Sequence, residues 1–299
     1  MSPLLHVTDA SRFAEGSLAA ATNALARQPA LALRRLTETG AGRTGLALVS
    51  GAVAMAALAP LLTSFDPFAL SGGSLTPPSR AHPFGTDALG RDVLSGVVYG
   101  ARTSLLIASA VSLLSLGCGM TVGLLGGFIG GFVDDALLRL TELLQVLPRF
   151  FLAIVAVALL GPGVDRLVLV LGLTSWPLLA RIVRAETLVL RRVDFVIAAE
   201  ATGATTVQIL WRTILPNVLP HAIVVSGLVF AQTLLLEASL GFLGLGDPNA
   251  MSWGLLAGQA QGFLRVAWWL PVFPGAAITT AVLGVNLLAD AVSAPRRRR

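Results

Sequence analysis

Long stretches of this sequence contain no charged residue. Residues 44–65 and 103–133 are uncharged throughout, and residues 217–241 and 269–292 contain almost no charge. The hydrocarbon core of a bilayer is about 30 Å thick, and a helix of about 20 mostly apolar residues crosses it. Only 12% of the residues are charged, against about 25% in soluble proteins. The sequence therefore predicts an all-α, polytopic membrane protein.

Six transmembrane helices are expected: the third begins at residue 150, and the others lie at residues 44–65, 103–133, 167–181, 217–241 and 269–292. The third and fourth have charge-free cores of only about 15 residues, so their ends must include flanking polar residues, as is tolerated where arginines snorkel to the interface. Residues 66–100 are too rich in glycine and proline for a span and predict an extramembrane loop. Six spans place both termini on the same side of the membrane.

The arginines predict which side this is. They cluster in the N-terminal stretch, around residues 181–212 and at the C-terminus, whereas the opposite loops contain few. Because cytoplasmic loops are enriched in basic residues, both termini are expected in the cytoplasm. The chain then divides into a cytoplasmic tail (1–43), the first span with its periplasmic loop (44–100), a core (101–295) and a basic tail (296–299).

Composition excludes several functions. All 21 basic residues are arginine, and without lysine the chain cannot form a P-loop for ATP. Cys118 is the only cysteine, so it is expected to be a small buried hydrophobe. The histidines lack metalloprotease spacing, and no aromatic-interleaved basic patch indicates a nucleic-acid site. We therefore expect no metal, cofactor or nucleic acid to be bound by this chain.

Residues 194–216, DFVIAAEATGATTVQILWRTILP, form the longest polar interruption of the second half. Asp194 is a good N-cap for a short helix, and Gly203 can end that helix in the left-handed conformation. Thr205 and Gln208 then have the spacing of a capping box that opens a second helix. The segment is therefore predicted to be helix, glycine, helix, closed by Pro216.

The first of these short helices has one small, mostly apolar face. Phe195, Ala198, Ala199 and Thr202 follow the i, i+3, i+4, i+7 pattern of such a face. It fits equally well into a groove on a partner or against the bundle of the same chain.

Two features inside the predicted spans are candidate sites. Gly119, Gly123, Gly127 and Gly131 recur every four residues, which lets helices approach closely. Contact within the chain is favoured over contact with a second subunit. Glu237 is a carboxylate in an apolar run. Inserting such a side chain into a membrane costs about 2.5–3.5 kcal/mol, which makes Glu237 a functional candidate. Since it lies close to the outer end of its helix, a structural pair or cap is favoured over substrate contact.

Residues 197–216 resemble the cytoplasmic loop of ATP-binding-cassette (ABC) importer permeases. That loop has the pattern E-A-A-x-x-x-G, nine residues, then I-x-L-P, and this chain matches it at Ala198, Ala199, Gly203, Leu215 and Pro216. Ile197 and Thr213 stand where the family has glutamate and isoleucine, although Glu200 lies one turn further on. The resemblance implies that these matching residues belong to a coupling loop (residues 186–216) that docks into an ATPase subunit. We further hypothesise that Glu200 supplies the missing acidic contact, while Ile197 and Phe195 add apolar ones.

Two further stretches resemble the permeases of dipeptide, oligopeptide and nickel importers. They are HPFGTDALGRDVLSG, from His82, and EASLGFLGLG, from Glu237. In the first, Thr86 and Asp92 are plausible caps of short interfacial helices, and Gly85 and Gly90 are plausible turns. Together the motifs identify the chain as resembling the C-type permease subunit of these systems.

The resemblance implies the type I ABC importer permease fold, a place in the bacterial inner membrane and vectorial transport without covalent chemistry. The implied partners are a second homologous permease, two ATPase subunits that bind ATP and Mg, a periplasmic or lipid-anchored substrate-binding protein and the lipid bilayer. The substrate remains open among dipeptides, oligopeptides, nickel and related solutes. A non-transporting scaffold or sensor that recruits an ATPase is the alternative, and a secondary transporter is a weaker third.

Overall fold

The structure is a computed structural model that describes residues 36–146 and 148–293. Helices dominate these residues, and the only strand-like pairings in them are two isolated bridges in the loop before α5. Arg12, Arg27, Arg34 and Arg35 of the expected N-terminal tail lie outside the described residues, as does the basic tail 296–299. The helices are α3 (Gly40–Ala57), α4 (Ala59–Leu62), α5 (Val93–Ile129), α6 (Gly131–Val146), α7 (Arg149–Leu160), α8 (Val164–Leu190), α9 (Asp194–Ala201), α10 (Thr206–Ile209), the π-helix η1 (Leu210–Ile214), α11 (Leu215–Phe242), α12 (Trp253–Gln259), the 3₁₀-helix η2 (Gln261–Phe263) and α13 (Trp269–Ser293).

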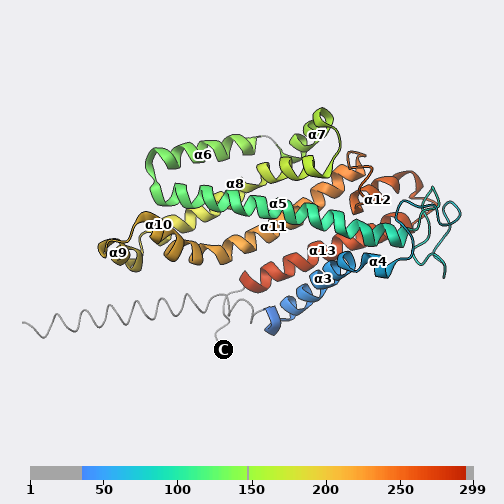
Figure 1. Cartoon of the computed structure of the whole chain (residues 1–299), viewed down its shortest axis with the longest axis horizontal. Helices are drawn as coiled ribbons and strands as arrows, with labels where there is room; N and C mark the ends of the chain where they lie inside the picture. The colour runs from blue at the N-terminus through green and yellow to red at the C-terminus, as the bar shows by residue number, and fades with distance from the viewer. Residues whose placement is uncertain (1–35, 147, 294–299) are drawn as a thin grey trace, which may run out of the picture.

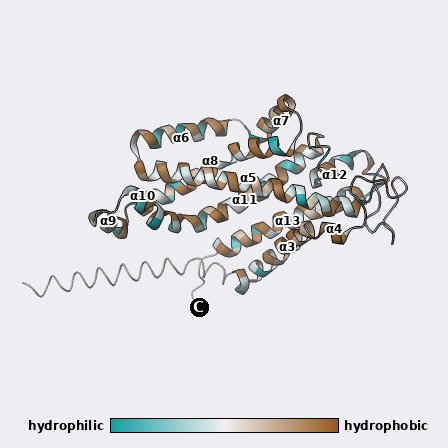
Figure 2. Ribbon diagram, in the orientation of Figure 1, coloured by the Kyte–Doolittle hydropathy of each residue, from teal (hydrophilic) through white to brown (hydrophobic). Residues whose placement is uncertain are grey.

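The long helices run lengthwise along an elongated bundle (Figure 1). α9 and α10 lie at one end of the bundle, which we call the coupling end. The loop between α4 and α5 and the short helix α12 lie at the opposite end, the loop end. Apolar residues cover much of the long helices between these ends (Figure 2). A helix that is apolar around most of its circumference is typical of a membrane span.

Helices occur at all six positions where spans were expected, but they differ in length. Four helical stretches in the described part of the chain are long and apolar enough to cross a bilayer: Val93–Ile129, Val164–Leu190, Thr206–Phe242 and Trp269–Ser293. α6 and α7 reach that length only together, and they are bent by 74°. Length and composition therefore give four or five spans rather than six.

The first expected span is broken. α3 ends at Ala57 and the four-residue α4 follows, with Pro60 in its first turn. The end of α3 is held by Arg102 of α5, whose Nε donates to the Ala56 carbonyl at 2.7 Å and whose Nη2 donates to the Ala57 carbonyl at 3.3 Å. A cation at a helix C-terminus satisfies carbonyls that lack a partner in the helix. This fixes α3 against α5.

α5 begins earlier than expected. Asp92 was expected to cap a short interfacial helix, but its side chain accepts from the Ser95 amide at 2.8 Å and opens α5 itself. Thr86 caps no helix; it is fully buried, and its hydroxyl donates to the Gly73 carbonyl. The expected turns are present, because Gly85 and Gly90 both have positive φ. The expected span began only at residue 103, because the charged Arg102 interrupts the uncharged stretch of the sequence although it lies within α5.

Candidate functional site

The first residues of the expected coupling loop, 186–190, still belong to α8, which ends at Leu190, and α9 follows after three residues. The expected N-cap is displaced by one residue. Val193 occupies the cap position with an extended backbone, and Asp194 is the first helical residue. Valine has no oxygen to accept from the first amides, but an acidic residue in the first turn still interacts favourably with the helix dipole. Asp194 therefore stabilises α9 by its charge rather than as a cap.

α9 ends at a left-handed glycine, as predicted. Gly203 has φ +83°, and its amide donates to the Glu200 carbonyl at 3.0 Å. The next amide, of Ala204, donates to the Ala199 carbonyl at 3.1 Å. These two bonds form a Schellman motif, which residues with a β-carbon rarely adopt. The turn between α9 and α10 therefore depends on glycine.

The capping box that opens α10 is also present. The Gln208 amide donates to Thr205 Oγ1 at 3.3 Å, and the Thr205 amide donates to Gln208 Oε1 at 3.0 Å. Each side chain thus satisfies a backbone donor of the other residue. The helix–glycine–helix arrangement of the coupling loop follows from local sequence alone.

Pro216 does not close the segment, contrary to expectation. It occupies the first turn of α11, where proline is tolerated because the missing N–H has no helical partner. The π-helix η1 precedes it, and the Leu215 amide donates to the Leu210 carbonyl five residues earlier. α10, η1 and α11 therefore form one continuous helical stretch. A displacement of α10 is transmitted directly to α11.

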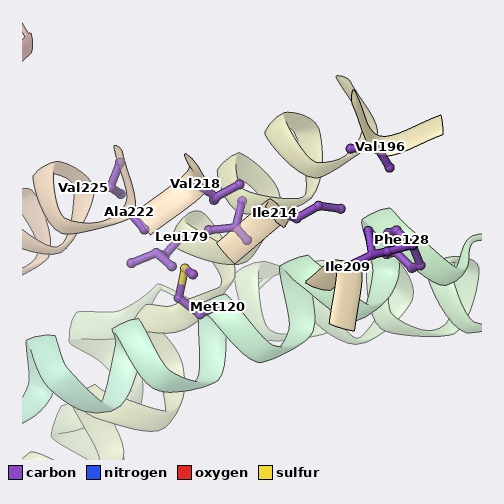
Figure 3. Packing of buried hydrophobic residues seen from close by; sticks show 10 residues of the cluster. Met120, Phe128, Leu179, Val196, Ile209, Ile214, Val218, Ala222 and Val225 are labelled. Atoms are coloured by element: carbon purple, nitrogen blue, oxygen red, sulfur yellow. The ribbon is translucent and has the colours of Figure 1, made fainter. Parts of the chain in front are cut away.

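The coupling loop is anchored on the bundle by an apolar cluster (Figure 3). Val196 of α9 is fully buried, and Ile209 of α10 and Phe128 of α5 are almost fully buried in the same cluster. Phe195 and Ala199 are partly buried and pack against this cluster. Their apolar face therefore rests at least partly on the protein's own bundle.

The opposite side of the coupling loop is exposed and largely apolar. Ile197 is 52% exposed, Val207 62% and Trp211 68%. Glu200 is exposed, and Ala198 is partly buried. Val207 and Trp211 are four residues apart, which places them on one side of the α10–η1 stretch. This exposed surface, defined by Ile197, Glu200, Val207 and Trp211, is the part of the coupling loop that is open to another protein.

The glycines of α5 lie against α8 at three of the four positions. A β-carbon on Gly119 would lie 2.6 Å from the Leu179 side chain, and one on Gly123 would lie 2.6 Å from Val183. Gly127 makes the same kind of approach, to Thr187, at 2.7 Å. The partners recur every four residues, so two helices pack along one seam.

Gly131 does not belong to this seam. It has φ +58°, starts α6, and a β-carbon there would meet nothing within 4 Å. It contributes to the turn between α5 and α6 and not to helix packing.

Glu237 is buried at the loop end of α11, where three elements meet. Ser104 of α5 donates to Glu237 Oε2 at 3.1 Å, and Ser104 Oγ in turn accepts from the Trp253 amide at 3.1 Å. Gly254 of α12 also packs closely against this side chain, because a β-carbon there would lie 3.0 Å from Glu237 Oε1. The carboxylate therefore joins α11 to α5 and α12, an arrangement that favours a structural role over substrate contact.

Two polar pairs were not anticipated from the sequence. His82 Nδ1 lies 2.9 Å from Asp92 Oδ1, and both residues are buried beneath the loop before α5. Arg184 of α8 binds Asp134 of α6 near the coupling end. The first pair joins the first and last residues of the HP-x-GTD-x-x-GRD stretch, so the motif itself contained both partners. The second joins residues 50 positions apart and has no local signal.

Together these features define a helical membrane protein with a helical loop that packs on the long helices through one side and is exposed on the other. Comparison with known proteins identifies the family of this protein. Residues 119–295 match the family of binding-protein-dependent transport system inner membrane components. The chain belongs to this family and is a multi-pass permease component.

Two similar proteins are named as peptide permeases. A putative peptide transport system permease protein of Brucella suis biovar 1 is 41% identical over 87% of this chain and 88% of its own length. The dipeptide transport system permease protein DppC of Alkalihalophilus pseudofirmus is 36% identical over 87% of this chain and 86% of its own length. The family identification predicted from the sequence motifs is therefore confirmed.

A solved structure shows the same fold. A chain of the MetNI methionine ABC transporter aligns with a TM-score of 0.52 and 18% identity, covering 67% of this chain and 97% of that chain. This likeness confirms the predicted all-α importer permease fold.

Proposed function

We propose that this chain is one of two permease subunits that form the translocation pathway of an ATP-driven peptide importer. The observation that carries the proposal is the coupling loop, a left-handed glycine turn between two capped helices with an exposed apolar outer side. The peptide-permease names of the relatives support the substrate class. The second permease, the ATPases and the substrate-binding protein are separate chains, and ATP and Mg bind to the ATPases alone.

The coupling end faces the cytoplasm in this proposal. Arg181, Arg184, Arg191, Arg192 and Arg212 surround the coupling loop, and basic residues favour the cytoplasmic side. α3 begins and α13 ends toward this same side of the bundle (Figure 1). Reporter fusions at Ser79 and after Arg299 are expected to indicate opposite sides of the membrane.

The coupling loop transmits motion through packed side chains rather than through a flexible tether. Val196 and Ile209 are buried in the same cluster as Leu179 of α8 and Val218 of α11. Close-packed side chains transmit displacement because they leave little free volume. When the ATPases close and draw the coupling loops together, α8 and α11 therefore move with them and open the pathway outward. ATP hydrolysis releases the loops and returns the pathway inward.

Reconstitution of the complete transporter in liposomes tests this function. The complex contains this chain, its partner permease and its ATPases, with ATP sealed inside and the binding protein outside. A labelled dipeptide should accumulate only when both ATP and the binding protein are present. ATPase recruitment without any peptide uptake would support a scaffold instead, and uptake driven by a proton gradient without ATP would support a secondary transporter.

A further inference from the structure

The third membrane segment is divided into two helices. α6 ends at Val146, α7 begins at Arg149, and the two axes differ by 74°. Pro148 lies between them and is exposed on the surface of the chain. Backbone that leaves helical structure within a membrane is tolerated only where it is covered by protein or faces a water-filled cavity. The break between α6 and α7 therefore does not face lipid.

Arg149 lies at this break, near the middle of the membrane. Its Nη1 makes a long hydrogen bond of 3.4 Å to Ser175 Oγ of α8. Ser175 falls within the charge-free stretch of α8, residues 167–180. At 1.5 Å per residue it is about 16 Å along the helix from Val164, which is about half the thickness of the hydrocarbon core. The guanidinium is therefore far from either membrane surface.

The exposed surface of α6 that leads to Arg149 is mixed, because it carries the polar Glu142 and Gln145 beside the apolar Leu143 and Val146, which are 70% and 74% exposed. Thr141 lines one small cavity together with Ala180, at the edge of the charge-free stretch of α8. Glu142 and Gln145 follow Thr141 and are exposed. A carboxylate or an amide exposed within the membrane is costly against lipid tails. The strip of α6 that carries Glu142 and Gln145 therefore faces water or another polar surface, whereas the exposed residues of α7, such as Phe151 and Leu159, are apolar.

Arg149 has no acidic partner among the residues that the structure describes. This distinguishes it from Arg184, which binds Asp134, and from Glu237, which is hydrogen-bonded to Ser104. Ionisable side chains within a membrane usually pair with one another or mark the path of a substrate or ion. A partly buried guanidinium with one long bond to a hydroxyl retains donors for a planar anion.

We infer that Arg149 is a binding site for the carboxylate of the transported solute, at mid-membrane on the wall of the pathway. This inference rests on the proposed function, because the pathway forms only with the second permease. A peptide carries a C-terminal carboxylate that matches the guanidinium donors. A bare divalent cation would be repelled at the same position. Arg149 thus favours carboxylate-bearing substrates over nickel.

The experiment uses the complete transporter in liposomes and the dipeptide alanyl-alanine as the probe. Arg149→Gln should lower the maximal uptake rate at least about tenfold, because a hydrogen bond to a charged group is lost. Arg149→Lys should retain more uptake than Arg149→Gln, because it keeps the charge. The matched control is Arg139→Gln, an exposed arginine of α6 outside the charge-free zone, which should import like the unmodified transporter.

Loss of uptake alone could also arise if Arg149 paired with a carboxylate of the second permease. Arg149→Cys in a Cys118→Ala background distinguishes these cases, because alanyl-alanine should slow modification of the introduced thiol during ATP-driven turnover. Uptake that falls without this protection contradicts the inference, as does unchanged uptake in Arg149→Gln. If the unmodified transporter imports no peptide, the proposed function itself fails.

Discussion

Arg184 of α8 binds Asp134 of α6 through two parallel hydrogen bonds. Arg184 Nε donates to Oδ1 at 2.5 Å and Nη2 donates to Oδ2 at 2.6 Å. A β-carbon on Gly126 of α5 would lie 3.0 Å from the Asp134 carboxylate, so the pair is enclosed by three helices. Bidentate pairs of this kind add geometric specificity to their energy. The pair therefore holds α6 over the seam between α5 and α8.

Removing one member of this pair should destabilise the protein. Asp134→Ala leaves Arg184 without its carboxylate and should lower stability by about 1.5–3 kcal/mol, measured as thermal unfolding in detergent. Asp135→Ala is the control, since its side chain is exposed and it makes no ion pair among the described residues. The double variant Asp134→Ala/Arg184→Ala should cost less than the sum of the two single variants. Additive losses would show that the two residues act independently.

The seam between α5 and α8 should not tolerate a methyl group. Gly123→Ala places a β-carbon 2.6 Å from Val183 Cβ and 2.7 Å from the Ala180 carbonyl. Overpacking of this kind typically costs about 1–3 kcal/mol. Gly117→Ala is the matched control on the same helix, because nothing lies within 4 Å of its added β-carbon. Equal thermal stability of the two variants would argue against a tight seam.

The left-handed turn of the coupling loop should be needed for transport. Gly203→Val places a β-branched residue at φ +83° and should cost about 1–2 kcal/mol locally, disturbing the angle between α9 and α10. Nothing surrounds an added β-carbon there, so membrane insertion should be unaffected. Gly203→Asn should be milder, because asparagine tolerates this conformation. Wild-type peptide uptake by Gly203→Val at equal protein level would contradict a coupling role for the turn.

Glu200 should supply the acidic contact that the family draws from the position of Ile197. A helix turns 100° per residue, so Glu200 points only about 60° away from Ile197. Both side chains are exposed, as a contact with another protein requires. Glu200→Ala should reduce co-purification of the ATPase and its stimulated hydrolysis, and Ile197→Glu should restore part of both. Full assembly and transport by Glu200→Ala alone would show that the carboxylate is merely solvated.

Features that depend on nearby residues were predictable from sequence. Gly203 and the Thr205–Gln208 box need only their own turns, and both were placed correctly. Features that depend on distant contacts were not. The pattern at Phe195 and Ala199 indicated an apolar face but not its partner, which is a cluster built from α5, α8 and α11.

Pro216 and Arg102 were wrongly expected to mark helix boundaries, because their tertiary setting lets the helix continue. Pro216 normally signals a boundary, but η1 shifts the hydrogen bonds by one residue, and the helix continues. Arg102 shortened the expected second span, yet its guanidinium reaches the end of α3. Arg149 was not predicted to be a site, because its depth in the membrane follows from its contact with Ser175 of α8, which the sequence alone does not show.

The exposed side of the coupling loop should bind the ATPase. Photo-crosslinking from position 197 in the assembled transporter probes this contact, because Ile197 is exposed and can be replaced by a photoreactive residue without disturbing the buried Val196. The control is position 243, where Leu243 is equally exposed but at the loop end. We expect a crosslink to the P-loop subunit from position 197 and none from position 243. Crosslinks from position 197 to lipid or to this chain alone, in a complex that imports peptide, would contradict the account.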